Sequence, residues 1–481
     1  MPVGRPSVLR WGSKTVRIFR HYVPMPLLVL ALVEAAILFG SVYAGVSARF
    51  FLIEVDLALH SPIGQATPVY LRAIVFTAVM MSVMTAFGLY RWDTTETDWG
   101  YYTRFAASFI VGLVTLVVVF YLVPHVFVGR GALALTLLFA AVGTGAARYV
   151  FVRAFANQAF KRRVLVLGTG ARAAEIQKLA QSGGSHFHVV GYIPFRGEVS
   201  AVAKGKEIRD KDPLLAIVKR YDIDEIVVGL RDRRRAGLSM EDLLECKLEG
   251  VHIADLSSFF ERESGHVQLD SVNTSWMVFS DGFRRNALRD VNKRLFDILV
   301  SGLLFIITLP VMVVTAALIV LTSGRPILYR QERIGECGHP FNLLKFRSMR
   351  TDAERNGPQW AKHNDDRVTT IGRFIRQTRI DELPQLINVL RGDMSFVGPR
   401  PERAFFVRQL STKIPYYASR HAVKPGITGW AQIRYPYGSS VEDAQRKLQY
   451  DLYYVKNHTV FLDLIILMQT MQVVLFSRGA R

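Results

Sequence analysis

The sequence predicts a membrane protein in three parts: a bundle of four transmembrane helices, an α/β domain of Rossmann-like type, and a basic domain anchored by a re-entrant apolar helix. Three observations support this fold class. Four apolar blocks fill the first third of the chain, a strand, glycine turn and helix pattern follows, and a second long apolar stretch contains a central proline. We expect the three domains to cover residues 1–160, 161–288 and 289–481.

Each apolar block in the first third has about the 20 residues that a helix needs to cross the hydrocarbon core of a membrane. The blocks lie at about 27–47, 73–90, 105–123 and 131–152. Cations precede the first block and follow the fourth, which places both ends of the bundle in the cytosol. These cations are Arg5, Arg10, Lys14, Arg17, Arg20, Arg153, Lys161, Arg162 and Arg163.

Glu34 is an acidic residue inside the first block. An ionisable group within a membrane span is a candidate for function. It can also be a side chain that faces the inside of the bundle or reaches toward its end. The sequence leaves both interpretations open.

Composition narrows the class of protein. The chain has 481 residues, 50% of them hydrophobic, and a net charge of +20. Cys246 and Cys337 are its only cysteines, so neither a disulfide framework nor a cysteine-ligated metal site can form. The positive charge fits nucleic acid, anionic lipid or a phosphorylated substrate. Residues 289–481 carry 28 Lys or Arg against 16 Asp or Glu, so most of the excess lies in the last domain.

The α/β domain is predicted from a glycine turn between a strand and a helix. The apolar run 164–167 precedes Gly168-Thr169-Gly170, and a helix is expected to about Gln181. Further strands are expected at 188–193, 225–229 and 251–255. The turn resembles a dinucleotide fingerprint, with Ala173 as its third small residue. Pro194-Phe195-Arg196 follows the second strand instead of an acid that would bind ribose, which disfavours a nicotinamide site and favours a structural or regulatory domain.

The second long apolar stretch, Leu295 to Leu321, is basic on both sides. A spanning helix would put one of these basic flanks outside the cytosol, against the usual charge rule. Pro310 lies near the middle of the stretch, where its ring and missing N–H kink or break a helix. We therefore expect a hairpin that enters and leaves by the same face, with a kinked span as the alternative.

The residues that suggest chemistry lie within 325–455. Asp381 and Glu382 are adjacent carboxylates among arginines, and Arg400 stands between two prolines. Such carboxylates suit Mg²⁺ shared with a phosphorylated ligand, and an arginine held between prolines is a preorganised phosphate donor. Taken singly, adjacent acids also open ordinary helices, and cations beside a membrane segment also bind lipid headgroups.

Several separated motifs occur together in one order and resemble the bacterial sugar transferase family, the monotopic polyprenyl-phosphate phosphoglycosyl transferases. With the four N-terminal blocks and the Rossmann-like insert, the whole chain resembles the large members, the undecaprenyl-phosphate glucose or galactose phosphotransferases. The motifs are Lys-Arg-Leu-Phe-Asp (293–297), Lys-Phe-Arg-Ser-Met (345–349), Asp-Glu-Leu-Pro-Gln (381–385), Gly-Asp-Met-Ser-Phe-Val-Gly-Pro-Arg-Pro (392–401), Lys-Pro-Gly-Ile-Thr-Gly-Trp-Ala-Gln (424–432) and Tyr-Tyr-Val-Lys-Asn (453–457).

The resemblance implies a mainly helical catalytic domain on the cytoplasmic face of the bacterial inner membrane. There, hexose 1-phosphate would pass from a UDP-hexose to undecaprenyl phosphate with release of UMP, at the start of exopolysaccharide or O-antigen assembly. It implies Asp381 as nucleophile and Mg²⁺ ligand, Glu382 beside it on the metal, and Arg376, Arg400 and Lys345 on phosphate. It further implies a homodimer and no nucleic-acid partner.

Two other readings stay open. One is a membrane-tethered, NAD-dependent enzyme that modifies nucleotide sugars through the glycine turn. The other is a scaffold for polysaccharide assembly without catalysis. The sequence does not identify the sugar or a ligand of the Rossmann-like domain.

Overall fold

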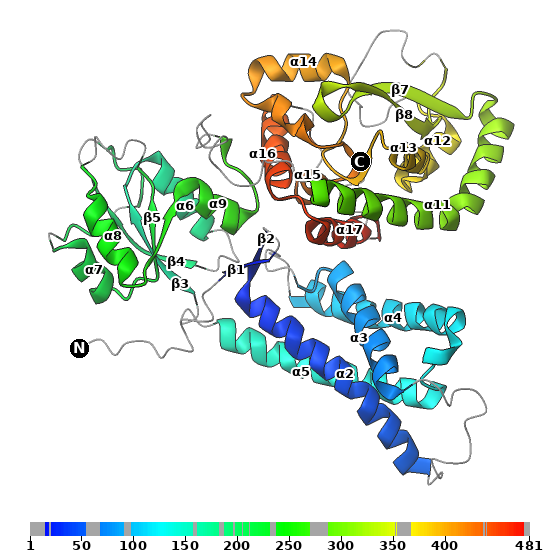
Figure 1. The fold of residues 1–481 in the computed structure, drawn as a ribbon, viewed down its shortest axis with the longest axis horizontal. Helices are drawn as coiled ribbons and strands as arrows, with labels where there is room; N and C mark the ends of the chain where they lie inside the picture. Colours follow the sequence, from blue (N-terminus) through cyan, green and yellow to red (C-terminus); the bar gives the residue numbers. More distant parts are fainter. Residues whose placement is uncertain are drawn as a thin grey trace. The chain divides into compact units, whose positions relative to one another are not determined.

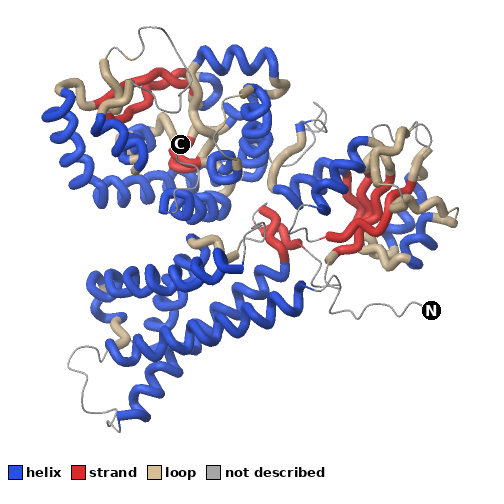
Figure 2. Tube along the Cα trace, turned by 180° about the vertical axis from the view of Figure 1, so that it is seen from behind, coloured by secondary structure: helices blue, strands red, loops and turns tan. Residues whose placement is uncertain are grey.

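The fold is described from a computed structural model, in which the chain divides into two compact units. The first unit holds residues 1–18 and 22–259, and the second holds 19–21 and 260–481. Helices predominate in both units (Figure 2). The structure describes residues 15–18, 21–53, 68–90, 98–156, 161–181, 187–195, 198–203, 205–210, 212–230, 237–269, 287–351, 353, 367–435, 438 and 440–475.

Four long apolar helices of the first unit coincide with the four predicted blocks (Figure 1). They are α2 (Met25–Ile53), α3 (Val69–Ala86), α4 (Asp98–Leu122) and α5 (Arg130–Ala156), accompanied by the short pair β1 (Thr15–Ile18) and β2 (His21–Pro24) and the turn η1 (Pro124–Val126). Phe76, Met80 and Leu116 are fully buried, whereas Val114 and Val117 are exposed. Each helix is long and apolar enough to cross a membrane. Of the cations expected before the first block, Arg5, Arg10, Lys14 and Arg20 lie outside the described residues.

Glu34 lies inside this bundle and is fully buried. Its carboxylate forms an ion pair with Arg148 of α5 and accepts a hydrogen bond from the hydroxyl of Tyr90. Arg148 also donates to the hydroxyl of Tyr101 on α4 over 2.8 Å and to the carbonyl of Leu89 over 3.1 Å. Glu34 therefore faces the inside of the bundle and ties α2 to α4 and α5.

The predicted parallel sheet is present in the first unit, in the order β4-β3-β5-β6. Its strands are β3 (Arg162–Leu167), β4 (Phe187–Ile193), β5 (Glu225–Val228) and β6 (His252–Asp255), and its helices are α6 (Ala171–Gln181), α7 (Leu214–Arg220) and α8 (Met240–Leu248). Helix α9 (Leu256–Ser264) follows β6 and contains the boundary between the two units. Helices α7 and α8 lie on one side of the sheet, and α6 on the other (Figure 1). Leu165 and Leu167 pack on the α7 and α8 side, because side chains alternate along a strand.

The second unit is mainly helical and has two short sheets, β7 with β8 antiparallel and β9 with β10 parallel. Tyr453 and Trp430 stack at the centre of its largest apolar cluster. Its elements are α11 (Ala287–Ser323), β7 (Leu328–Ile334), η4 (Glu336–Gly338), β8 (Pro340–Phe346), α12 (Thr370–Gln377), η5 (Ile380–Glu382), α13 (Gln385–Arg391), β9 (Ser395–Val397), α14 (Ala404–Lys413), η6 (Tyr417–Ala422), β10 (Gly426–Thr428), α15 (Trp430–Arg434), α16 (Val441–Asn457) and α17 (Val460–Leu475).

The apolar stretch with Pro310 forms one long helix, α11, which keeps its helical hydrogen bonding past the proline. Its ribbon bends sharply along its length (Figure 1). Near its start, Arg294 donates to the carbonyls of Val389 and Leu390 over 2.6 and 2.7 Å. At its end, Arg347 donates to the carbonyl of Ser323 over 2.5 Å. Both ends of α11 are thus held by the same unit, and the helix is unbroken at Pro310, where the sequence predicted a turn.

Candidate active site

Asp381 and Glu382 lie in the single turn η5, between α12 and α13. Arg379, just before this turn, has a φ of 60°, in the left-handed region that residues other than glycine rarely adopt. Pro384 follows at the start of α13, a position where the missing N–H of proline costs nothing. This backbone fixes the directions of two adjacent carboxylates.

Glu382 is surrounded by cations. Its Oε1 atom lies 3.0 Å from Arg400 Nη2, 3.4 Å from Lys345 Nζ and 3.5 Å from Arg379 Nη1. Burial of Glu382 favours the neutral acid, but these three cations outweigh burial and hold the pKa of the carboxyl well below its usual range. Burial also lowers the pKa of Lys345, with Glu382 opposing the change. Glu382 is therefore ionised at neutral pH.

Asp381 has a different environment although it is the next residue. It is 8% exposed, and we find no hydrogen bond or ion pair of its carboxylate within the part of the chain that the structure describes. Burial raises the pKa of Asp381, with Lys345, Arg376 and Arg379 acting in the opposite direction. Burial is thus the largest influence on the pKa of Asp381, although three cations lie near it. Among the described residues, Asp381 is thus a carboxylate without a hydrogen-bonded or charged partner, next to Glu382, which has three.

Arg400 is held on a stiff loop. Proline flanks it on both sides, and Gly398 donates its N–H to the carbonyl of Thr428 over 2.8 Å. A side chain on Gly398 would collide with the backbone of residues 424–426, so this loop and β10 need a glycine to approach so closely. Arg400 thereby presents its guanidinium to Glu382 with little backbone freedom.

The structure brings together most of the residues that the sequence singled out. Lys345, Arg400, Asp381 and Glu382 lie in one cluster, and Arg379 joins it. Arg376, at the end of α12, contributes charge to Asp381 without an ion pair among the described side chains. Pro310 is part of α11, and no contact between it and this cluster is seen among the described residues.

Magnesium was expected at the two carboxylates. No group of three or more His, Cys, Asp or Glu side chains that could hold a metal occurs among the described residues. Mg²⁺ is often held by one or two carboxylates together with substrate phosphates, so the Asp381 and Glu382 pair fits a site that a diphosphate completes.

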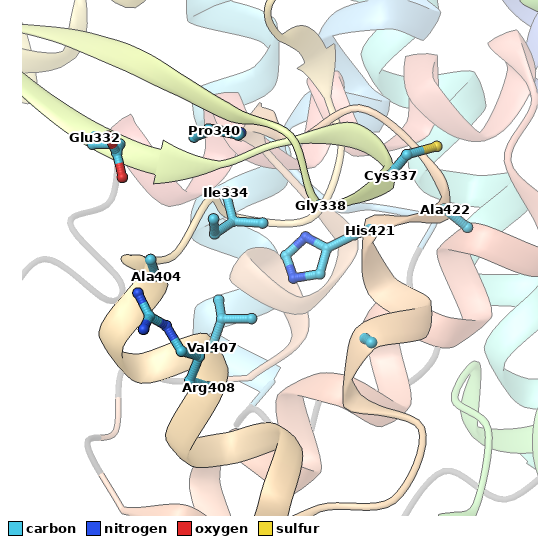
Figure 3. Close-up of a pocket in the computed structure, with 11 residues that line it drawn as sticks. Glu332, Ile334, Cys337, Gly338, Pro340, Ala404, Val407, Arg408, His421 and Ala422 are labelled. Carbon is cyan, nitrogen blue, oxygen red and sulfur yellow. The ribbon is translucent and has the colours of Figure 1, made fainter.

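A cavity of about 620 Å³ lies in the same unit, between the β7–β8 hairpin and helix α14 (Figure 3). Ile334 and Val407 face the ring of His421 across it. Burial, followed by the charge of Arg420, lowers the pKa of His421 to about 4, so its ring is neutral. This cavity could not be predicted from the sequence, because its lining comes from segments far apart in the chain.

The glycine turn of the first unit is filled by the chain itself. The N–H of Thr169 donates to the carboxylate of Glu198 over 2.8 Å, and its carbonyl accepts from Ala201 over 2.8 Å. Gly168 has a φ of 116°, and a side chain there would meet Glu198 and Leu230 at 3.2 Å. Glu198 therefore occupies the position from which a dinucleotide phosphate would approach the turn. This disfavours the hypothesis of an NAD-dependent enzyme.

Comparison with known proteins gives a family for the second unit. The profile of the bacterial sugar transferase family matches residues 288–477, which contain the whole carboxylate and cation cluster. A UDP-glucose:undecaprenyl-phosphate glucose-1-phosphate transferase from Xanthomonas campestris is 32% identical over 330 residues, which cover 66% of this chain and 68% of the relative. The chain belongs to the bacterial sugar transferase family. Its apolar helices, and a similarity over 330 residues that extends outside the family match at 288–477, make it a large membrane form of that family.

Two other relatives of this sugar transferase differ in their named sugar. A UDP-N-acetylgalactosamine-undecaprenyl-phosphate N-acetylgalactosaminephosphotransferase from Aeromonas hydrophila is 39% identical over 272 residues, 56% of this chain and 63% of the relative. A UDP-glucose:undecaprenyl-phosphate glucose-1-phosphate transferase from Klebsiella pneumoniae is 35% identical over 261 residues, 53% of this chain and 56% of the relative. The matches with these two thus span less than two thirds of their length.

Proposed function

We propose that this chain transfers a sugar 1-phosphate from a UDP-sugar to undecaprenyl phosphate, releasing UMP, as the first membrane step of polysaccharide assembly. The relatives support the two substrates through their names, which include both glucose and N-acetylgalactosamine. The observation that carries the proposal is a buried Asp381, with no hydrogen bond or ion pair to any described residue, next to a Glu382 surrounded by three cations.

The reaction proceeds in two displacements. In the first, an oxygen of Asp381 attacks the sugar-bearing phosphorus, and the bond from that phosphorus to the bridging oxygen breaks. UMP leaves with that oxygen, and the sugar phosphate stays on Asp381. In the second, an oxygen of undecaprenyl phosphate attacks the same phosphorus and the bond to Asp381 breaks, which restores the carboxylate. One difficult displacement between two anions becomes two easier ones.

In this reaction the cations around the carboxylates would bind the negatively charged diphosphate of the UDP-sugar. Lys345, Arg379 and Arg400 share one oxygen of Glu382, so they are already gathered where a diphosphate would bring its charge. Arg400 and Arg376 would hold phosphate oxygens, for which the planar fork of arginine is well suited. Mg²⁺ bound at Asp381 and Glu382 would neutralise part of the charge on the transferring group.

We further propose that α11 is re-entrant and that the second unit lies on the cytoplasmic face of the inner membrane. The anchoring of both helix ends by one unit supports this, as do the exposed apolar side chains between them. These include Leu303, Ile306, Ile307, Val313 and Val314. A homodimer remains a proposal from family resemblance, to be tested by light scattering of the solubilised protein.

The test is a half-reaction without lipid. Wild-type protein mixed with Mg²⁺ and radiolabelled UDP-glucose, UDP-galactose or UDP-N-acetylgalactosamine should release about one equivalent of UMP per site and keep the sugar phosphate on protein, with ping-pong kinetics. Asp381→Asn should fold and release none, while Asp290→Asn, the same change at an exposed position of α11, should behave as wild type.

Other results of this experiment would favour one of the alternative hypotheses. UMP release only in the presence of polyprenyl phosphate, with sequential kinetics, would leave Asp381 as a metal ligand and the transfer direct. Lipid-linked sugar made equally well by Asp381→Asn would favour a scaffold. Turnover strictly dependent on added NAD would favour the nucleotide-sugar enzyme.

A further inference from the structure

The loop from Pro399 to Glu402 is anchored through every one of its carbonyl groups. Two of the four donors are backbone N–H groups and two are arginine side chains. The pairs are Gly426 N to Pro399 O at 2.9 Å, Arg420 Nη2 to Arg400 O at 3.0 Å, Arg333 Nη1 to Pro401 O at 3.1 Å and Ile334 N to Glu402 O at 2.9 Å. The bond to the carbonyl of Arg400 itself is thus made by a side chain, which a substitution can remove.

Arg420 is built into the interior of the second unit. It is 6% exposed, and its Nη2 atom lies 2.8 Å from a carboxylate oxygen of Asp451, which is 2% exposed. Its Nη1 atom donates to the hydroxyl of Tyr417 over 2.8 Å. A buried charge is tolerated only when it is paired and hydrogen-bonded, and Asp451 supplies that pairing from α16. The arrangement uses the fork of the guanidinium, which the single ammonium of lysine cannot reproduce.

The chain of contacts runs from α16 to the reacting carboxylates. Asp451 pairs with Arg420, Arg420 holds the backbone of Arg400, and Arg400 reaches Glu382. Because prolines restrict the backbone on both sides of Arg400, the position of its carbonyl also sets where its side chain starts. A small displacement of Arg400 would lower the reaction rate strongly, since moving a positioning contact by about 1 Å can reduce the rate on the order of 100-fold.

We propose that Arg420, with Asp451 as its counterion, is a positioning residue that aims Arg400 at the diphosphate of the UDP-sugar. This inference rests on the proposed function, because it assigns Arg400 to the substrate of that reaction. Because Arg420 is buried, it would act on the substrate through Arg400 and not by direct contact.

The experiment is a double-mutant cycle on the full-length protein, with UMP release and the dissociation constant for UDP as readouts. Arg420→Lys should lower kcat/KM for the UDP-sugar by about 10- to 100-fold and weaken UDP binding. In an Arg400→Ala background the same change should cost less than about threefold, because residues that act through one contact are not additive.

A matched control is Arg162→Lys, which alters another buried pair, with Glu225 in the sheet of the first unit, 2.9 Å between charges. It should change thermal stability and leave both readouts near wild type. If Arg420→Lys does not yield folded protein, Asp451→Asn, which preserves the size of the side chain, takes its place with the same expectation.

Equal losses from Arg420→Lys in the wild-type and Arg400→Ala backgrounds would overturn the positioning role, as would a result no different from Arg162→Lys. Failure of the proposed function looks different. In that case wild-type protein neither binds UDP nor releases UMP from any UDP-sugar, whatever residue stands at 420.

Discussion

At the scale of single residues, Asp381 and Glu382 are adjacent in sequence, yet their environments shift their pKa values in opposite directions. Burial dominates at Asp381, while three cations dominate at Glu382. The sequence identified the pair, because its motif is local. It could not assign the two environments, since these depend on Lys345 and Arg400, which reach the site from β8 and from the loop after β9.

A change at Glu382 should separate binding from chemistry. Glu382→Gln removes the charge shared by Lys345, Arg379 and Arg400, so these cations become more available to a diphosphate. We expect UDP affinity to be retained or increased and single-turnover UMP release to fall on the order of 100-fold, the loss typical of one preorganised electrostatic contact. Calorimetry with UDP and rapid-quench kinetics measure the two effects. A parallel loss of affinity and rate would argue against this division.

His421 should make the second unit sensitive to acid. Its folded pKa, lowered by burial to about 4, lies below the value near 6.5 of an unfolded histidine. The unfolded chain therefore binds the extra proton first, and stability falls as pH decreases from about 6.5 toward 4. His421→Gln should flatten this part of the curve when thermal unfolding is followed at pH 8 and pH 5.5. Equal slopes in both proteins would exclude His421 as the cause.

At the scale of elements, local pattern predicted where helices and strands form, because apolar periodicity and glycine turns are properties of short segments. The strand predicted at 188–193 is β4, Phe187–Ile193. The shape of α11 was harder to foresee. Pro310 was expected to kink or break the helix, and α11 stays helical past it while Phe305, Met312 and Ile319 pack in one apolar cluster with Phe346 and Ile375.

The path of α11 can be tested by labelling. Cysteines placed at Asn292 and Ser323, after Cys246 and Cys337 are replaced by serine, should react with a membrane-impermeant maleimide from the same side of oriented vesicles. Labelling from opposite sides would contradict the re-entrant proposal. Pro310→Leu restores an N–H and removes the ring, so it should straighten the helix, move position 323 to the other side and abolish transfer.

At the scale of the whole molecule, the buried polar contacts within each unit join distant parts of the chain. Glu34 and Arg148 are 114 residues apart in the first unit, and Asp297 and Ser395 are 98 residues apart in the second unit. No local sequence pattern predicts two further pairs, Arg420 with Asp451 and Glu198 with Thr169. This is why the sequence, with its family resemblance, singled out the carboxylates, Lys345 and Arg400 but not Arg420 and Asp451, which hold the loop of Arg400.

The buried pair of the bundle gives a prediction at this scale. Glu34→Gln leaves Arg148 without its counterion and should destabilise the protein by about 3–5 kcal/mol. The double change Glu34→Leu with Arg148→Met should recover most of that loss, because it leaves no unpaired charge. Thermal unfolding in detergent checks both. A single variant as stable as wild type would show that the pair is not needed for the bundle.

Glu198 contacts the glycine turn, and this affects whether the stability of the domain can depend on nucleotide concentration. A domain that must bind a nucleotide to be stable gains or loses stability as the concentration of that nucleotide changes. Here the carboxylate that contacts the turn is covalently part of the chain, so its effective concentration does not vary with metabolism. We therefore expect the stability of the fold around residues 161–259 to be independent of the nucleotide concentration at this position, even though the proposed reaction consumes a nucleotide sugar.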